Sequence, residues 1–374
     1  MFNMQTCYSL FMLLSSLFIA GCSTTVPHNV NEHFYDYQHI TNELHALTEK
    51  NAPFVETYVL DYTHEGRAIM AIKIGKRANP IQTKPGVLAI FAEHAGEHDT
   101  TSLAMGIMQY LIDHYSTDEN VSRILEKTEL WIIPMMNPDG VDYDLSGAGE
   151  PFSWRKNRRR TGEATYGVDL NRNWEYHFET ESLPEMPKNY SQKDNPNYAG
   201  DKPFSERETR AVRDFLLAHK NIRILLDYHS GGAGFMQGAV GCFNGRGSRK
   251  GTHPSVDTFC NNVIDGFAEA ISDPDDGRPD FLLTNREDAA SILRQRVPFY
   301  LRPFVPSTFF QEPGTAVNYV YDQLNIAAIC IEMFRDRSFF KKLPDSQNKL
   351  TKNQIRGFLR LLTVQTTNED VGFR

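Results

Sequence analysis

The chain has 374 residues, enough for one large domain or two of ordinary size. Its hydrophobic content of 40% and charged content of 23% are typical of a soluble globular protein. The formal net charge is -8, and no stretch concentrates enough lysine and arginine to follow a phosphate backbone, which excludes a nucleic-acid partner.

The first residues have the pattern of an export signal. No charged side chain precedes Cys22, and an apolar run extends from Leu10 to Ala20. This run is too short to span a bilayer comfortably and suits the apolar core of a secretory signal. Residues 19–22, Ile-Ala-Gly-Cys, resemble the bacterial lipobox, in which the cysteine is lipidated after cleavage. We therefore predict a lipoprotein signal at 1–21 and a protein anchored in the cell envelope through Cys22, facing the periplasm or in the outer membrane. A plain signal peptide or membrane anchor is the alternative.

A polar segment at 22–36 is interpreted as a tether. Cysteine usage beyond it leaves two readings open. In an oxidising compartment Cys242 and Cys260 could form a disulfide, or both could remain buried thiols. Together with Cys330 they include no CxxC motif, which excludes a cysteine-based zinc finger.

Residues 37–365 alternate strand patterns with helix patterns and contain no repeat or linker, which predicts a single domain. Strands are predicted at 55–62, 68–74, 86–91, 130–134, 222–228 and 327–332. Helices are predicted at 37–50, 103–115, 205–219, 256–271 and 352–362. Short apolar strands between amphipathic helices indicate an α/β sandwich with a largely buried sheet, in which ligands bind at the carboxyl ends of the strands.

Two of these strands end in possible metal ligands. His94 and Glu97 follow the strand at 86–91, and His229 follows the strand at 222–228. An isolated HxxE is most often a pair of solvated side chains. A third possible ligand at the same sheet edge favours a metal site instead. Two histidines and one glutamate bind Zn²⁺ and leave its fourth position open, as a catalytic site requires.

The same segment allows a rival interpretation. His94, Glu97 and His98 also form HxxEH, in which both histidines bind the metal and the glutamate acts as the base. That arrangement requires a helix, so that residues four apart share a face. Gly96 and the strand directly upstream make a helix at this position less favourable.

Four further segments occur in order along the chain: Glu65-Gly66-Arg67, Pro134-Met135-Met136-Asn137-Pro138-Asp139-Gly140, Trp154-Arg155-Lys156-Asn157-Arg158 and Gly167-Val168-Asp169-Leu170-Asn171-Arg172-Asn173-Trp174. With the metal ligands, they resemble motifs of the carboxypeptidase A family of zinc peptidases. The resemblance extends from about Tyr37 to the C-terminal helix. It implies a mixed sheet with helices on both faces and one zinc ion per chain.

The resemblance also implies roles for individual residues. The substrate is a peptide with a free C-terminal carboxylate, which Asn171 and Arg172 bind. A guanidinium grips a carboxylate through two hydrogen bonds, so these residue types suit the task. Arg155 polarises the scissile carbonyl and stabilises the developing oxyanion. Arg67, in the opening motif, is assigned to the substrate site.

Glu332 is the expected general base, acting on a zinc-bound water. It ends the apolar strand at 327–332, where burial raises a carboxyl pKa toward neutrality. The family places its base in a similar strand. A glutamate that only pairs with Arg335 or Arg337 is the alternative.

The chain departs from the family pattern at the substrate pocket. The position 22 residues before Glu332, where the best-studied members have a tyrosine that covers the substrate, is Phe310. None of Tyr300, Tyr319 and Tyr321 matches by count. Val317 stands where a member selective for basic residues has an aspartate, and Cys330 shares the strand face of Glu332. A neutral pocket favours apolar or aromatic C-terminal residues.

Three functions fit these observations. The first is hydrolysis of the C-terminal residue of peptides outside the cytoplasm. The second is cleavage of peptidoglycan stem peptides by the same fold. The third is a zinc-binding module without catalysis, against which the set of His94, Glu97, His229 and Glu332 argues.

Overall fold

The computed structural model describes residues 34–76, 84–148, 153–178, 190–230, 240–242, 313–333 and 355–363, with the backbone alone for 240–242, 332 and 333. Several predicted features lie outside the described residues. These are the signal at 1–21, the lipidated Cys22, the helix at 256–271, the pairing of Cys242 with Cys260, and Phe310. Among the described helices, none is long and apolar enough to cross a membrane.

Within the described ranges, seven strands form one mixed sheet in the order β1-β2-β4-β3-β5-β7-β6. Their bounds are Val55–Tyr62 (β1), Ala68–Ile74 (β2), Gly86–Phe91 (β3), Glu129–Ile133 (β4), Ile222–Ser230 (β5), Val240–Cys242 (β6) and Ala327–Met333 (β7). The four central strands β4, β3, β5 and β7 are parallel, and antiparallel strands flank them on both sides. The carboxyl ends of the parallel strands therefore meet at one edge.

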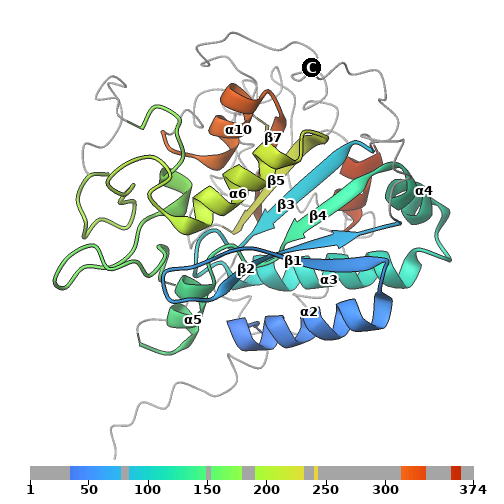
Figure 1. Ribbon diagram of the computed structural model, residues 1–374, viewed down its shortest axis with the longest axis horizontal. Coiled ribbons are helices and arrows are strands. Elements are labelled where there is room, and N and C mark those ends of the chain that lie inside the picture. Colours follow the sequence, from blue (N-terminus) through green and yellow to red (C-terminus); the bar gives the residue numbers. More distant parts are fainter. Residues whose placement is uncertain are drawn as a thin grey trace, which may run out of the picture. The chain divides into compact units, whose positions relative to one another are not determined.

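Helices cover both faces of this sheet (Figure 1). They are α2 (Tyr37–Asn51), α3 (His98–His114), α4 (Glu119–Lys127), α5 (Pro138–Leu145), α6 (Arg207–Ala218), α10 (Ala316–Leu324) and a helix at 355–363. The chain steps from β3 to β4 through α3, and in the opposite direction from β4 to β5 through α6. Because such crossovers are right-handed, α3 and α6 lie on opposite faces. The predicted α/β fold is confirmed.

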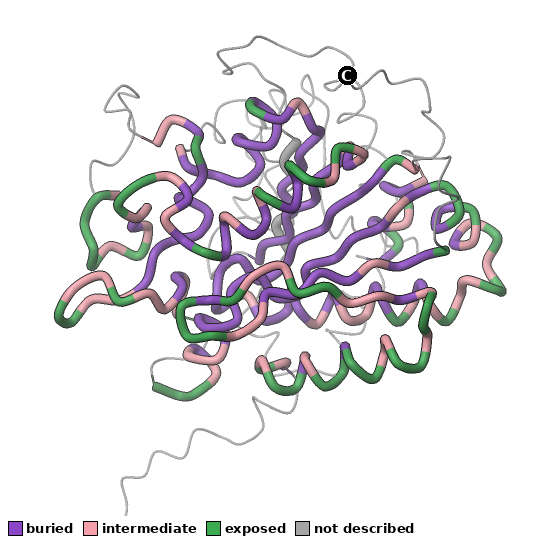
Figure 2. Tube along the Cα trace, viewed as in Figure 1, coloured by how far each residue is buried: buried purple, intermediate pink, exposed green. Residues whose placement is uncertain are grey.

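The parallel strands are buried on both faces, as their unbroken apolar sequences predicted (Figure 2). All six residues of β3 are buried, and Phe91 at its end stacks on Tyr228 of β5 with ring centroids 4.5 Å apart. Each fully buried Leu, Ile or Phe side chain contributes about 1.5–3 kcal/mol. This apolar centre fixes the positions of the strand ends, where the polar side chains of the site begin.

The predicted and observed helices differ most at α3. The apolar period starts at Leu103, which set the predicted start, but the helix begins five residues earlier, at His98. Its first turn is polar and nevertheless buried, because its side chains bond to other parts of the protein. The short helices α4, α5 and α10 were not predicted. In α5, Asn137 caps the first turn and Pro138 starts it, a signal that is clear only once the helix is known.

A buried polar group joins the turn between β1 and β2 to the start of α6. Glu206 and Glu208 are fully buried. One Glu206 oxygen lies 2.9 Å from Arg159 Nε and the other 3.2 Å from His64 Nε2. Asn157 donates its amide to Glu206 (2.8 Å) and Glu208 (3.3 Å). Burial and, next, the charge of Glu206 raise the pKa of Glu208 to about 7.

Glu208 is expected to make the stability depend on pH. Between its unfolded pKa near 4.5 and its folded pKa of about 7, the folded protein binds a proton that the unfolded chain has lost. The free energy of unfolding therefore falls as pH rises through this window. In wild type this fall in the free energy of unfolding should be roughly 2–3 kcal/mol between pH 4.5 and 7.5, and Glu208→Gln should remove it. Urea unfolding at each pH gives the measurement. Glu49→Gln, at an exposed site of α2, is the control. Parallel pH profiles of wild type and Glu208→Gln would contradict this assignment.

Candidate metal centre

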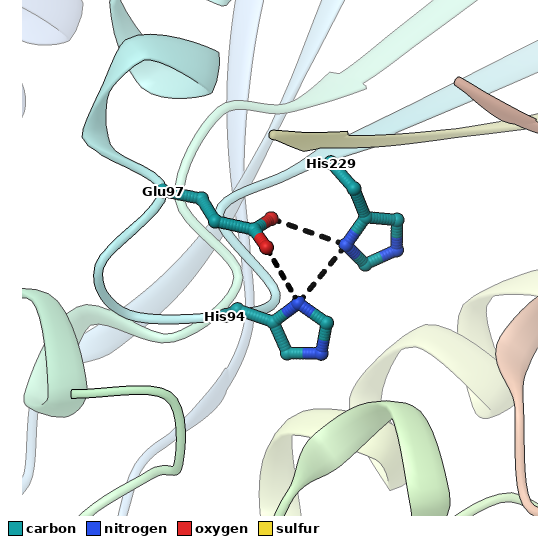
Figure 3. A group of neighbouring side chains, drawn as sticks. All are labelled: His94, Glu97 and His229. Atoms are coloured by element: carbon teal, nitrogen blue, oxygen red, sulfur yellow. Dashed lines mark hydrogen bonds and ion pairs between the residues drawn. The ribbon is translucent and has the colours of Figure 1, made fainter. Parts of the chain in front are cut away.

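Three predicted ligands converge at the shared edge of β3 and β5 (Figure 3). His94 Nδ1 lies 2.8 Å from Glu97 Oε1, and His229 Nδ1 lies 3.1 Å from Glu97 Oε2. The two histidine Nδ1 atoms are themselves 3.1 Å apart. His94 and His229 are buried, while Glu97 keeps 12% of its side chain exposed. Donor atoms of the three side chains thus face one point.

This donor set fits a zinc ion. In a tetrahedral zinc site with bonds of about 2.0–2.1 Å, neighbouring donor atoms stand about 3.3 Å apart. The separations of 2.8 to 3.1 Å come close to that spacing. Two imidazole nitrogens directed at each other are also unfavourable unless a proton or a cation lies between them. Nitrogen and carboxylate donors together are the set that Zn²⁺ accepts.

Carboxylates hold the far sides of both histidines. His94 Nε2 lies 3.3 Å from Asp169 Oδ1, and His229 Nε2 lies 3.0 Å from Asp227 Oδ2. For His94 such a contact favours the tautomer with the proton on Nε2 and leaves the Nδ1 lone pair for a metal. At His229 the amide Nδ2 of Asn171 also faces Nε2, at 3.1 Å. The ring orientations needed for binding therefore exist in the folded chain.

The charges of this site act strongly on one another. Burial by itself would raise the pKa of Glu97, but His94 and His229 outweigh it and hold that pKa well below its usual range. Burial would likewise lower the pKa of His229, but Asp227 and Glu97 raise it well above its usual value. Burial and then Asp227 raise the pKa of Glu93 to about 8. In the metal-free protein, protons thus offset the buried carboxylates, a task that a cation performs equally well.

His98 does not share this point. It is the first residue of α3, whereas His94 precedes the helix, so the two do not lie on one helical face. His98 Nε2 instead donates to Asp144 Oδ2 at 2.7 Å. The geometry thus gives no support to the rival HxxEH interpretation.

Arg155 lies beside the three ligands, as the motif implied. Its Nε donates to Asp169 Oδ2 at 2.7 Å, and its Nη1 is 3.3 Å from His94 Nδ1. Asp169 therefore contacts both a metal ligand and this guanidinium. The charges of Arg155 and then His94 outweigh burial and hold the pKa of Asp169 far below its usual range.

Asn171 and Arg172 form a short 3-10 turn on the other side of His229. Asn171 Nδ2 lies 3.1 Å from His229 Nε2, and its Oδ1 accepts the backbone N–H of Ala316 at 3.0 Å. Arg172 Nη1 donates to the carbonyl of Asn171 at 2.6 Å, and its guanidinium lies 5.4 Å from the ring centroid of Tyr190. Both predicted carboxylate-binding residues are thus placed next to the metal ligands.

The close fit of this turn depends on one glycine. Gly314 has a φ of 72°, and a Cβ there would collide with the backbone carbonyl of Arg172. Its carbonyl accepts the N–H of Trp174 at 3.0 Å, and its own N–H donates to Tyr176 at 2.7 Å. Backbone pairing therefore seats the start of α10 on the Asn171 turn.

The backbone places Glu332 directly beside His229, a candidate metal ligand. In the parallel pairing of β5 with β7, Glu332 is the partner of His229. Adjacent strands lie about 4.8 Å apart, so the side chain of Glu332 starts at the sheet edge that holds the ligands. That side chain lies outside the described residues.

The predicted pocket residues are placed only in part. Val317, in α10, and Cys330, in β7, are 2% and 4% exposed and belong to the hydrophobic core. Phe310 lies outside the described residues. Arg67 binds Glu65 (2.6 Å), Asp139 (2.9 Å) and Asp142 (2.8 Å). These contacts fasten the β1–β2 turn to α5.

Sequence reasoning missed the carboxylates behind the histidines. Asp227 precedes His229 by two residues on β5, so the strand period puts both on one face, and this signal was available. Asp169 stands within a motif that was recognised for Asn171 and Arg172 alone. Glu93, adjacent to His94, accepts a hydrogen bond from Trp174 Nε1 at 3.1 Å, a contact between segments that no local pattern reveals.

Comparison with known sequences agrees with this geometry. A family model described as zinc carboxypeptidase matches residues 40–355. The chain is 32% identical over 145 residues to a zinc carboxypeptidase of Saccharothrix mutabilis subsp. capreolus, covering 39% of this chain and 33% of that protein. It is 30% identical over 201 residues to carboxypeptidase B of Astacus astacus, covering 53% of this chain and 61% of that protein. The chain thus matches from 33% to 61% of the length of these two relatives.

Solved structures share the fold. The crystal structure of carboxypeptidase A from Helicoverpa armigera superposes with a TM-score of 0.63 at 19% identity, covering 90% of this chain and 74% of that one. At this identity the likeness concerns the fold. The family model matches most of this chain. In this chain, the fold shared with that structure surrounds the converging His94, Glu97 and His229. The chain belongs to the zinc carboxypeptidase family.

Proposed function

We propose that this protein is a zinc-dependent carboxypeptidase that removes the C-terminal residue of peptides outside the cytoplasm. One observation carries the proposal: the donor atoms of His94, Glu97 and His229 converge beside Arg155 and Asn171. A metal site alone would suit many hydrolases. A metal site flanked by a guanidinium on one side and an Asn-Arg turn on the other suits a peptide bond next to a terminal carboxylate.

The described residues divide the work of hydrolysis among them. When bound, zinc supplies a Lewis acid and lowers the pKa of a coordinated water. Asp169 and Asp227 keep the two histidines turned toward the metal position. Arg155, fixed by Asp169, stabilises the oxyanion that develops on the scissile carbonyl.

Glu332 completes the chemistry in this proposal. The support is its backbone position, which pairs with His229 in the sheet. In this role Glu332 accepts the proton of the attacking water and later delivers it to the leaving amine. Asn171 and Arg172 hold the terminal carboxylate and so place the last peptide bond, rather than an internal one, at the metal.

We also propose that the protein acts in the cell envelope. The support is the apolar run from Leu10 to Ala20 and the lipobox-like residues ending at Cys22. A lipid on Cys22 would keep the enzyme beside peptides that reach that compartment.

His229→Ala is expected to remove zinc binding. It deletes one of three donors, and the pair that remains holds zinc far more weakly. Zinc content after dialysis should fall from one ion per chain to nearly none, as measured by elemental analysis. His114→Ala, at the end of α3, is the matched control and should keep the ion. Equal zinc content in both variants would exclude His229 as a ligand.

Glu332→Gln is expected to abolish turnover and keep zinc. An amide cannot take the proton of the attacking water, so kcat should fall by roughly 10²–10⁴-fold. Peptide mass spectrometry with and without a zinc chelator gives the measurement. Internal fragments instead of stepwise C-terminal trimming would overturn the exopeptidase assignment. Cleavage of muropeptides alone would instead favour stem-peptide hydrolysis.

The pocket is expected to prefer apolar or aromatic C-terminal residues. Val317 supplies no negative charge to pair with Lys or Arg, and its side chain is buried in the core. In a panel of peptides that differ in the last residue, kcat/KM should be highest for Phe or Leu. A wild-type preference for basic residues would refute the prediction.

A further inference from the structure

The first turn of α3 follows the ligand Glu97 directly, and its first two side chains lead to different parts of the site. His98 and Asp99 are 1% and 4% exposed. Burial of such polar side chains costs free energy unless each has a hydrogen-bond partner. Each of the two bonds to a separate segment that carries another residue of the active site.

His98 reaches the segment of Arg155 through Asp144. His98 Nε2 donates to Asp144 Oδ2 at 2.7 Å, and both side chains are 1% exposed. The other oxygen of Asp144 accepts the backbone N–H groups of Ser153 (3.1 Å) and Trp154 (2.7 Å). One buried carboxylate thus joins the start of α3 to the two residues that precede Arg155.

The same two segments also pair through their backbones. Gly96 N–H donates to the carbonyl of Trp154 at 2.7 Å, and Ala95 N–H donates to the carbonyl of Arg155 at 3.1 Å. These bonds lie between His94 and Glu97. Together with the His98–Asp144 contact, they connect residues 94–98, the metal loop, to residues 153–155, the Arg155 segment. These connections fix the distance from the Arg155 guanidinium to the ligands.

Asp99 reaches the segment of His229. Its Oδ1 accepts the hydroxyl of Ser230 at 2.7 Å, and Ser230 is 2% exposed. Ser230 directly follows His229 at the end of β5. This bond therefore joins the helix that starts after Glu97 to the strand that carries the third ligand.

We propose that His98 and Asp99 are positioning residues with separate effects. His98, through Asp144, sets the place of Arg155 relative to the metal ligands. Asp99, through Ser230, sets the place of His229. The part that concerns Arg155 rests on the proposed function, because it assumes that Arg155 acts on the substrate. Loss of the His98 bond then weakens turnover with zinc in place, and loss of the Asp99 bond weakens zinc binding.

His98→Asn and His98→Gln test the first effect. Both variants carry an amide, but the nitrogen of Gln reaches near the position of Nε2 and that of Asn stops near Nδ1. A misplacement of about 1 Å can lower the rate by up to 10²-fold, so His98→Asn should lower kcat by roughly 10- to 100-fold. Its KM and zinc Kd should stay within about threefold of wild type, because only a transition-state contact is lost. His98→Gln should restore most of kcat.

Two results would overturn this effect: an unchanged kcat in His98→Asn, or a loss of zinc that accounts for the loss of activity. Asp144→Ser, whose side chain is too short to reach His98, provides the same test if His98→Asn does not fold.

Ser230→Ala and Asp99→Ala test the second effect. Loss of a partner that supports a ligand typically weakens metal binding by about 10- to 100-fold, which chelator competition measures as a rise in the zinc Kd. With saturating zinc, kcat of Ser230→Ala should return to within about threefold of wild type. The double variant Asp99→Ala/Ser230→Ala should bind zinc no more weakly than Asp99→Ala alone, because each change removes the same hydrogen bond. An unchanged zinc Kd in Ser230→Ala, or fully additive losses, would exclude the proposed link.

A readout without turnover separates this inference from the proposed function. Amide hydrogen exchange at Ala95, Gly96 and Trp154 should be at least about tenfold faster in His98→Asn than in wild type, and close to wild type in His98→Gln. Exchange rates that are equal in all three proteins would overturn the inference. If the wild-type protein binds zinc but cleaves no peptide, the proposed function fails, while exchange and zinc affinity still decide the positioning roles.

Discussion

The parallel pairing of β3 with β5 is the constraint on which the rest of the site depends. Its register matches Phe91 to Tyr228, so the two strands end side by side. His94 and Glu97 come directly after one strand, and His229 is the next residue of the other. A shift in register would draw the polar residues at the strand ends into the apolar sheet, which costs free energy. The hydrophobic centre therefore determines where the metal ligands meet.

Around that edge the protein collects four carboxyl groups. Glu93, Glu97, Asp169 and Asp227 all lie within 3.6 Å of a histidine nitrogen, and Arg155 is the guanidinium beside them. Each unpaired buried charge costs several kcal/mol. A divalent cation would offset much of this cost. The same carboxylates orient the histidines, so these groups favour metal binding both through their charge and through the position of the ligands.

Side-chain hydrogen bonds hold the loops that surround the metal centre. Asn137 donates to the carbonyls of Glu93 and Lys156, each at 3.2 Å, and so ties the metal loop to the Arg155 segment. Asn173 donates to the carbonyls of Ala199 (2.7 Å) and Lys202 (3.1 Å). Irregular backbone of this kind has no regular partner, and buried amides take that place. These bonds therefore tie the loops to the segments beside them.

The sequence by itself indicated six of the seven described strands, all but β6, and the three candidate ligands. Strands 55–62, 68–74 and 86–91 have the predicted bounds. Their length of six to eight residues and their β-branched and aromatic residues favour a strand over a helix. His94, Glu97 and His229 were predicted from their places at strand ends. The resemblance added Arg155, Asn171 and Arg172, which lie beside those ligands. In these cases the signal is local in the chain.

The tertiary structure alone decided which polar side chains support the site. The buried first turn of α3 breaks the apolar period, so the sequence placed the helix start too late. His98 could be read as a ligand until Asp144, 46 residues away, was seen to accept its hydrogen bond. Arg67 binds three carboxylates that fasten a turn, contacts that its own motif did not indicate. A polar residue's role depends on which partner reaches it, and such partners are distant in sequence, where no periodicity records them.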